Sequence, residues 1–269
     1  MEDLLIFDAQ MPELYHNRLG PFCFLPYAQE SAQRLSELEG SSLLEIASGT
    51  GIVTHELDRV LGDHWRILAT DISVDMLDLN RSYTAHSTRT TYEVVDALNL
   101  PYEDNSFDVV LCHFGWMFFP DKDLAAREAL RVLKPGGTIL IAVWGSLAEN
   151  PAFETAGNVI AECFPDDPPN FLMTPFGYHV EEELHRLVNE PGFVNVSVQR
   201  ISKIGNSESA FGIAEGFYGG TPMVLAIAKR DASRLGELRE KLTAELTARL
   251  GDAPLKAPMV AVYVTAEKP

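Results

Sequence analysis

The chain has 269 residues, of which 46% are hydrophobic, enough for one large α/β domain or two smaller ones. Lysine and arginine together number 21 against 39 aspartates and glutamates, which gives a formal net charge of −18. A chain this acidic repels phosphate backbones, so we expect no nucleic-acid partner.

The first predicted elements are two short helices within residues 8–38, separated at Gly20-Pro21. Strands then alternate with helices up to Gly145. The expected strands are 41–47, 65–71, 90–96, 106–114 and 138–145, and the expected helices are 52–61, 74–83 and 122–133. The stretch Leu-Lys-Pro-Gly-Gly at 133–137 predicts a turn, because Pro135 and the glycines cannot continue a helix. This rhythm favours a doubly wound, mostly parallel sheet with helices on both faces.

The rhythm changes after Gly145. Residues 146–178 predict an irregular segment with one helix at 151–163. A helix at 180–189, a strand at 193–201 and a final strand at 259–266 follow, and leucines at helical spacing lie between those two strands. These are Leu235, Leu238, Leu242, Leu246 and Leu250, whose spacing predicts an amphipathic helix that packs on the domain. A connection of this length inside a domain is typical of a lid.

The cysteine spacing and the hydropathy of the chain indicate the cellular compartment in which we expect the protein. Cys23, Cys112 and Cys163 lack a metal-binding spacing and lie in apolar neighbourhoods, which indicates buried thiols in a reducing compartment. We see no signal peptide at the start and no run of about 20 apolar residues. We therefore expect a cytoplasmic chain with no membrane partner and no metal, and we leave a homodimer open.

A glycine turn follows the first predicted strand, where residues 45–51 read Glu-Ile-Ala-Ser-Gly-Thr-Gly. Gly49 and Gly51 let a ligand approach the backbone closely, and the helix that begins near Gly51 aims free N–H groups at it. Asp71 and Asp96 end the next two strands, so three neighbouring strands end in a glycine turn or an acid. A carboxylate at Asp71 can accept hydrogen bonds from ribose hydroxyls, and one at Asp96 can accept from the amine of adenine.

The charge of Glu45 indicates which of two kinds of cofactor this turn would bind. A nicotinamide-binding turn has the pattern G-x-G-x-x-G and presents N–H groups to a pyrophosphate, which a nearby carboxylate would repel. This turn lacks the third glycine, and Glu45 suits an ammonium or sulfonium charge instead. S-adenosylmethionine carries both charges, together with adenine and ribose, and has no phosphate.

These residues resemble the class I S-adenosylmethionine-dependent methyltransferases. The resemblance covers about residues 40–145 and rests on the 45–51 turn, Asp71, Asp96-Ala97, the stretch Leu-Pro-Tyr-Glu-Asp-Asn-Ser-Phe-Asp-Val-Val and the 133–137 stretch. It is strongest to the ubiquinone/menaquinone methyltransferase-like small-molecule branch. Ala47 stands where many members have glycine, as it often does in that branch. The N-terminal segment lacks the Y-D-x-M-N start of true quinone methyltransferases, which argues against a quinone substrate.

The resemblance implies a seven-stranded sheet whose last strand is antiparallel, with a helical cap. It also implies five segments: an N-terminal helical cap segment (1–39), a cofactor-binding α/β core (40–145), an irregular insert with a helix and the sixth strand (146–204), a helical lid insertion (205–256) and the final strand (257–269). The implied cofactor-binding residues are Tyr15, Arg18, Glu45, Ala47, Gly49, Gly51, Asp71, Ile72, Met76, Asp96, Ala97, His113 and Phe114. The cofactor would leave as S-adenosylhomocysteine.

Methyl transfer needs an aligned acceptor and a closed site, and it needs a base only if the acceptor must lose a proton. His113 ends the fourth predicted strand and is the candidate base, with an orienting role as the equal alternative. The candidate walls of a pocket for an apolar or aromatic small molecule are Trp116, Met117, Phe171, Phe176, Tyr178 and Phe217. The alternative functions are cofactor binding without methylation and a nicotinamide oxidoreductase.

Overall fold

The computed structural model describes residues 11–84 and 86–269. They form two compact units. The first contains residues 11–27, Gly145–Gly177 and Ser202–Val260, and the second contains Ala28–Trp144, Tyr178–Ile201 and Ala261–Pro269. The boundary between the units falls within strand β6 (Val194–Ser207) and within strand β7 (Leu255–Glu267).

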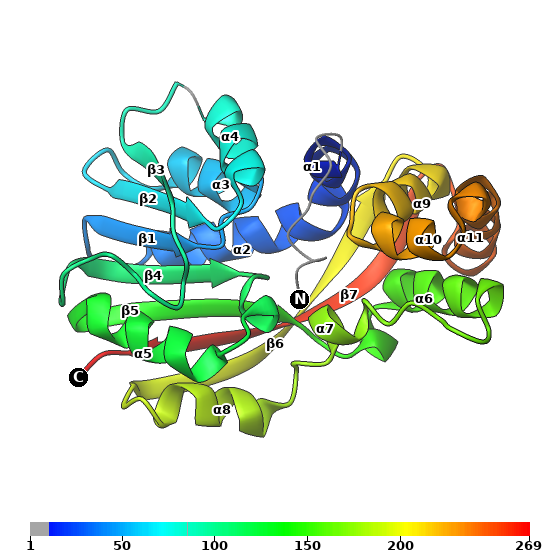
Figure 1. Cartoon of the computed structure of the whole chain (residues 1–269). Helices are drawn as coiled ribbons and strands as arrows, with labels where there is room; N and C mark the ends of the chain where they lie inside the picture. Colours follow the sequence, from blue (N-terminus) through cyan, green and yellow to red (C-terminus); the bar gives the residue numbers. More distant parts are fainter. Residues whose placement is uncertain (1–10, 85) are drawn as a thin grey trace. The chain divides into compact units, whose positions relative to one another are not determined.

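One seven-stranded sheet has the strand order β3-β2-β1-β4-β5-β7-β6 (Figure 1). Its first five strands are β1 (Ser42–Ile46), β2 (Arg66–Asp71), β3 (Thr90–Val94), β4 (Phe107–His113) and β5 (Leu133–Trp144). Neighbours among these five pair in parallel, whereas β7 pairs antiparallel with β5. This confirms the predicted doubly wound, mostly parallel sheet with its last strand antiparallel.

The helices of the second unit lie before β1, in the connections between the strands, and between β5 and β6. They are α2 (Leu25–Ser36), α3 (Ile52–Val60), α4 (Val74–Tyr83), α5 (Lys122–Val132) and α8 (Glu181–Asn189), together with the short helix η3 (Trp116–Phe118). Helices α3 and α4 pack on β2, and α5 packs on β5 and on α8 (Figure 1). The central strands β1, β4 and β5 are largely buried, whereas β3 at the edge of the sheet is mostly exposed. The five strands follow one another in the order that the sequence predicts.

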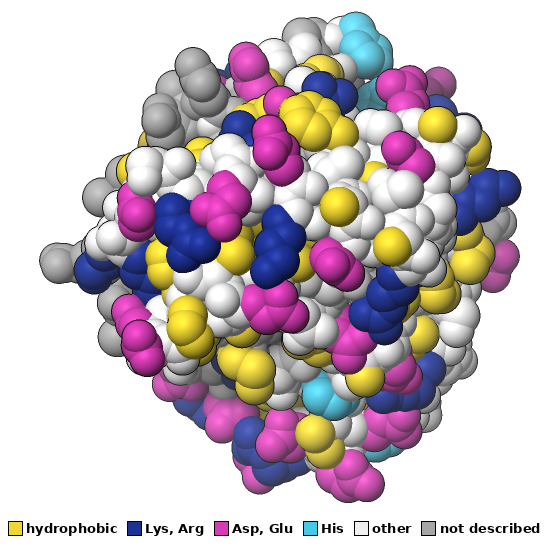
Figure 2. All heavy atoms as spheres, turned by 90° about the vertical axis from the view of Figure 1, so that its right-hand side faces the viewer, with side chains coloured by type: hydrophobic (Ala, Val, Ile, Leu, Met, Phe, Trp, Pro, Cys, Tyr) yellow, Lys and Arg dark blue, Asp and Glu magenta, His cyan; other side chains and the backbone are white. Residues whose placement is uncertain are grey.

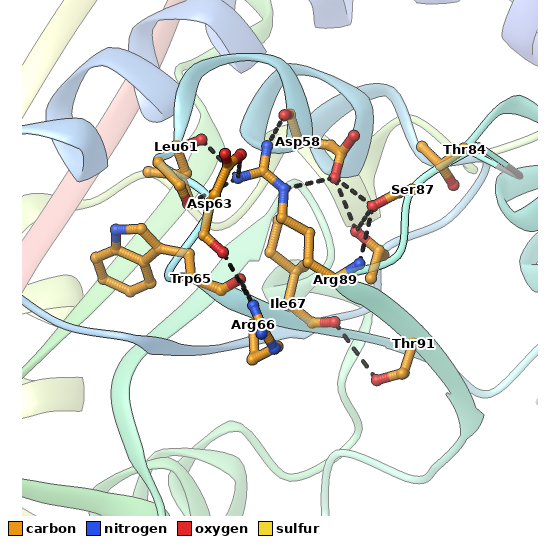
Figure 3. Close-up of polar contacts among 12 residues, drawn as sticks. Asp58, Leu61, Asp63, Trp65, Arg66, Ile67, Thr84, Ser87, Arg89 and Thr91 are labelled. Carbon is orange, nitrogen blue, oxygen red and sulfur yellow. Dashed lines mark hydrogen bonds and ion pairs between the residues drawn. The ribbon is translucent and has the colours of Figure 1, made fainter.

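A polar network fixes the amino-terminal side of β3 to the end of α3 (Figure 3). Arg89 donates through Nε to Asp58 Oδ1 at 3.0 Å, and its Nη1 donates to the carbonyls of Leu61 at 2.6 Å and Gly62 at 2.7 Å. A cation is favourable at these carbonyls because the helix dipole is negative there. Partial burial acts to raise the pKa of Asp58, but hydrogen bonds from Ser87 and Arg89 outweigh it and lower the pKa.

The first unit is mostly helical. Its elements are α1 (Met11–Leu14), the π-helix η2 (Tyr15–Phe24), η4 (Leu147–Glu149), α6 (Pro151–Cys163), α7 (Met173–Phe176), α9 (Ala210–Gly219), α10 (Met223–Asp231), η5 (Ala232–Arg234) and α11 (Leu235–Leu250). Helix α11 packs on α6 and α9 and buries Leu238, Leu242 and Leu246, as the leucine spacing predicts. Figure 2 shows acidic and basic side chains interspersed among hydrophobic ones on the face that it presents.

Ion pairs join the helices of this unit at its surface. Lys241 lies 2.7 Å from Glu162, and Arg249 lies 2.6 Å from Glu154. Exposed pairs of this kind contribute about 0–1 kcal/mol each, so the buried leucines of α11 account for more of the packing energy.

Three sequence predictions were wrong in detail. Residues 15–24 form a π-helix that continues through Gly20-Pro21, where a break was predicted; Leu25 N–H bonds to the carbonyl of Gly20, and this wider turn relieves the clash of proline with the preceding turn. Residues 8–10 of that prediction lie outside the described residues. The predicted turn at 133–137 is an irregularity within β5, where Leu133 pairs with Phe107 and the register shifts before Thr138 pairs with Val109. Strands β6 and β7 are longer than predicted.

Candidate functional site

Residues 47–51 form a tight turn at the carboxyl end of β1. Three of them have left-handed backbone angles, with φ of 55° at Ala47, 55° at Gly49 and 85° at Gly51. Ala47 is the unusual member, because a residue with a Cβ rarely adopts this conformation and such strain gathers at functional sites. A Cβ built on Gly49 would meet no atom within 4 Å, so the backbone of the turn is open on that side.

The end of β4 approaches this turn through Gly115, a residue that sequence reasoning missed. A Cβ built on Gly115 would lie 2.5 Å from the Cβ of Ala47 and 3.1 Å from Cys112 Sγ. Only glycine fits there without moving the turn. Gly115 therefore allows the chain after β4 to lie directly beside the glycine turn.

Asp71 ends β2 and holds the glycine turn from the neighbouring strand. Its Oδ2 accepts from Gly49 N–H at 2.8 Å, and its Oδ1 accepts from Ser73 N–H at 2.9 Å. Burial raises the pKa of Asp71, and the backbone N–H bonds from Ser73 and Gly49 oppose that rise. Each carboxylate oxygen can accept a second hydrogen bond, so the group fits the ribose-binding role expected of it.

Glu45 lies beneath the turn, 1% exposed, in the middle of the sheet. Its Oε2 accepts from the hydroxyl of Thr54 on α3 at 2.6 Å. Burial raises the pKa of Glu45 to about 8, the hydrogen bond from Thr54 lowers it, and the charge of Asp71 raises it further. A cationic group near the turn would favour the ionised carboxylate, since the charge is otherwise poorly solvated.

The remaining predicted adenosine-binding residues follow β2 and β3. Val95 N–H bonds to the carbonyl of Asp71 at 3.0 Å, which sets the exits of the two strands side by side. Ile72 is 52% exposed, whereas Met76 and Ala97 are buried. Asp96 is exposed, and its Oδ1 accepts from Leu98 N–H at 2.9 Å. These exits provide an apolar surface with one carboxylate at its edge.

Aromatic side chains gather at the carboxyl ends of β4 and β5. His113 meets Phe114 edge-on at 4.5 Å between ring centroids, and Phe114 stacks on Trp144 at 4.0 Å. Phe114 has a left-handed φ of 57°, another strained position. The end of β4 therefore carries one titratable ring, His113, against an apolar stack.

The segment after β4 continues this aromatic cluster. Trp116 and Met117 are buried, and Trp116 lies 5.3 Å from Phe119 between ring centroids. Lys122 donates to the carbonyl of Phe119 at 2.9 Å and lies 5.1 Å from the ring centre of Tyr178. Partial burial raises the pKa of Tyr178. Trp116, Met117 and Tyr178 thus belong to the unit that carries the glycine turn.

The other predicted site residues belong to the helical unit. Arg18 of η2 donates to Glu215 of α9 at 2.8 Å, and the ring of Tyr15 lies 4.9 Å from that of Phe24. Phe153 packs on Phe176 and on Phe217 at 4.7 Å each, and Phe171 is half-buried. The roles of Tyr15, Arg18, Phe171, Phe176 and Phe217 therefore stay predictions.

The three cysteines of the chain are reduced. Cys23, Cys112 and Cys163 are buried and form no disulfide, as predicted. Burial raises the pKa of Cys112. Within residues 11–84 and 86–269, no cluster of three or more His, Cys, Asp or Glu side chains is arranged to hold a metal ion. Among the helices formed by these residues, none has the length and hydropathy of a transmembrane segment.

Comparison with known proteins addresses the class to which this site belongs. Residues 44–141 match the model of a methyltransferase domain. Demethylmenaquinone methyltransferase of Staphylococcus aureus (strain JH9) is 31% identical over 172 residues, which are 60% of this chain and 71% of that protein. The chain therefore belongs to the class I S-adenosylmethionine-dependent methyltransferases, in the quinone methyltransferase-like branch.

Solved structures agree with this fold. A phosphoethanolamine N-methyltransferase 2 of Haemonchus contortus, solved with phosphomonomethylethanolamine and S-adenosylhomocysteine, has a TM-score of 0.63 at 19% identity; the match covers 98% of this chain and 58% of that one. The [4+2]-cyclase SpnF has a TM-score of 0.57 at 20% identity, covering 90% and 81%. The membership confirms the methyltransferase interpretation over the nicotinamide oxidoreductase.

Four residues around the turn were missed by sequence reasoning: Ser48, Thr54, Asn80 and Gly115. Asn80 left the clearest signal. It follows Met76 and Leu77 at helical spacing, so a polar amide occupies the face of α4 that is otherwise apolar and buried. Such a residue needs hydrogen-bond partners, and the structure supplies them from the turn and from α3.

Proposed function

We propose that this methyltransferase moves the methyl group of S-adenosylmethionine to a small apolar or aromatic molecule. The observation that carries the acceptor class is the aromatic stack at the carboxyl ends of β4 and β5, where the rings of His113, Phe114 and Trp144 contact one another in turn. Apolar rings at this position favour an apolar acceptor, and a wall of this kind suits a small molecule better than a protein side chain.

The cofactor site is assigned to the exits of β1, β2 and β3. The open left-handed backbone at Gly49 admits a ligand closely, and the Asp71 carboxylate keeps acceptor capacity for ribose hydroxyls. Ile72, Met76 and Ala97 would pack on adenosine, and Asp96 would accept from its amine. Glu45 would stabilise the ammonium of the methionine part through its negative charge.

The bound cofactor supplies a methyl carbon activated by its sulfonium. The side chains after β4 then hold the acceptor in line with that carbon and exclude water. In the transfer, a lone pair of the acceptor would form the new bond to the methyl carbon, and the electron pair of the C–S bond would pass to sulfur. If the attacking atom carries a proton, His113 accepts it.

Closure of the site is assigned to the helical unit. Tyr15 and Arg18 are proposed to cover the methionine carboxylate, and Phe171, Phe176 and Phe217 to line the acceptor pocket. Transfer from a sulfonium favours such a closed site. We further propose that the enzyme is cytoplasmic, needs no metal, and has neither nucleic acid nor a membrane as a partner. A homodimer is compatible with this proposal.

A quinone-type acceptor is the second candidate, because the relative from Staphylococcus aureus is named for demethylmenaquinone. The test incubates the purified chain with S-adenosylmethionine labelled in its methyl group and a panel of phenols, amines and quinones. The proposal expects labelled product from a small aromatic member. Transfer only to protein or nucleic acid would contradict it, and transfer only to demethylmenaquinone would select the second candidate.

A further inference from the structure

Asn80 of α4 is completely buried behind the glycine turn. Its side-chain Nδ2 donates to Ser48 Oγ at 3.2 Å and to Thr54 Oγ1 at 2.9 Å. An amide nitrogen carries two hydrogens, so these two bonds use both. Asn80 thus joins the middle of the turn to the first turn of α3.

The amide of Asn80 also packs against the last glycine of the turn. A Cβ built on Gly51 would overlap the side-chain amide of Asn80. Gly51 therefore has two reasons to be glycine, the left-handed φ of 85° and the close approach of this amide. The glycine turn therefore packs directly against the side chain of Asn80.

A directed chain of hydrogen bonds continues from Asn80 to Glu45. The hydroxyl of Thr54 has one hydrogen, and because its oxygen already accepts from Asn80, that hydrogen is directed to Glu45 Oε2 at 2.6 Å. The hydroxyl of Thr70 donates to the main-chain carbonyl of Glu45 at 2.9 Å. The buried carboxylate thereby has its supporting donor fixed by a residue 35 positions away in the chain.

We propose that Asn80 is a positioning residue of the cofactor site, which holds the 47–51 turn through Ser48 and keeps the Thr54 hydroxyl directed at Glu45. Asn80 acts through these neighbours. The inference rests on the proposed cofactor site, in which ionised Glu45 stabilises the ammonium of the cofactor. Loss of the Asn80 donors frees the Thr54 hydroxyl to turn away, so the carboxylate of Glu45 becomes harder to ionise.

Other titratable groups surround Glu45. Asp71 at the end of β2 is its charged neighbour, and Cys112 of β4 and Tyr92 of β3 interact with it electrostatically. Burial raises the pKa of both Cys112 and Tyr92, so both stay neutral around pH 7. Glu45 and Asp71 are therefore the groups to separate by substitution.

The test measures binding of S-adenosylhomocysteine by calorimetry between pH 6 and 9 for the wild type and Asn80→Ala. We expect Asn80→Ala to raise the Kd at least about tenfold at pH 7, since one tenfold change corresponds to about 1.4 kcal/mol. We also expect the pH at which affinity reaches its plateau to shift upward. Glu45→Gln should remove the pH dependence and identify Glu45 as its source.

Ser82→Ala is the matched control, because Ser82 is an exposed polar residue of the same helix whose hydroxyl bonds to the carbonyl of Leu79. Its Kd should stay within about twofold of the wild type. If Asn80→Ala does not fold, Thr54→Val removes the relaying hydroxyl with little change in shape, and Ser48→Ala removes the bond to the turn. The same upward pH shift is expected from Thr54→Val.

The outcomes separate this inference from the proposed function. A wild type that does not bind S-adenosylhomocysteine overturns the cofactor site itself, and with it the role of Asn80. A wild type that binds, with variants that bind equally well, overturns only the role of Asn80. A loss of affinity by the same factor at every pH also overturns the relay, because it would reflect a loosened fold.

Discussion

The carboxyl ends of β1 and β2 and the carboxyl ends of β4 and β5 are built from different side chains. At β1 and β2, buried polar groups meet in fixed hydrogen bonds: Glu45 with Thr54, Asp71 with Gly49, Asn80 with Ser48. At β4 and β5, aromatic rings pack on one another around His113. A hydrogen bond requires a particular group at a particular place, whereas many rings can fill an apolar wall. In the proposed function, the first region therefore specifies one cofactor, and the second is able to take different acceptors.

The largest expected effect comes from the aromatic end. If His113 is the base, His113→Ala should lower kcat by about 10²–10⁴-fold and leave the Kd for S-adenosylhomocysteine nearly unchanged. His55→Ala, at an exposed position of α3, is the control. Turnover and calorimetry on both variants check this. A smaller loss of turnover would assign His113 an orienting role.

A substitution among the polar residues at the carboxyl ends of β1 and β2 should instead change the affinity for the cofactor. Asp71→Ala removes the acceptor for Gly49 and Ser73 and the proposed acceptor for the ribose, and should weaken cofactor binding by about 10- to 150-fold, or roughly 1.5–3 kcal/mol. Asp78→Ala, on the exposed side of α4, serves for comparison. An unchanged Kd in the Asp71 variant would mean that this carboxylate only supports the turn.

Glycine substitutions compare the turn with the helical unit. Gly51→Ala should lower the free energy of unfolding by about 1–3 kcal/mol, because the backbone is left-handed and Asn80 occupies the space. Gly236→Ala, near the start of α11 with no neighbour in the way, should raise it by up to about 1 kcal/mol. Denaturant unfolding measures both. A neutral Gly51 variant would show that the turn is less constrained than its contacts indicate.

Glu45 should give the most gradual effect, because it changes the free energy of unfolding through pH. Burial raises its pKa to about 8 in the folded chain, against about 4.3 unfolded. Between these values the folded chain holds a proton that the unfolded chain has released, so this contribution to stability is full below about pH 4.3 and is lost as pH rises toward 8. One proton gives a slope of at most about 1.4 kcal/mol per pH unit. Unfolding at pH 5.5, 6.5 and 7.5 should show a shallower slope for Glu45→Gln than for the wild type; equal slopes would exclude a protonated Glu45.

The sequence predicted the sheet well because its buried central strands, β1, β4 and β5, leave nearly continuous apolar runs. It predicted the turn at 47–51 and the acid at Asp71 because each has its own local pattern. It failed at Gly20-Pro21 and at 133–137, where a π-helix and a register shift absorb residues that end regular helices and strands. It also missed Asn80 and Thr54. The polar amide on the apolar face of α4 was a local signal, but its partners depend on contacts between α3 and α4 that no local pattern encodes.

The aromatic residues show the other limit of prediction. Phe114 and Trp144 are far apart in sequence and meet only because β4 and β5 are neighbours in the sheet. The sequence shows that both residues are apolar, but it does not predict that their rings stack. Phe153, Phe176 and Phe217 likewise meet from separate helices, and no local pattern in the sequence encodes that contact.

The central claim of the proposed function is that the turn at 47–51 and Asp71 bind S-adenosylmethionine. Calorimetry of the purified chain with S-adenosylmethionine, S-adenosylhomocysteine and NAD tests it most directly. We predict saturable binding of the two sulfur compounds with a rise in Tm, and no heat or Tm shift with NAD. Tight NAD binding without binding of either sulfur compound would contradict the claim.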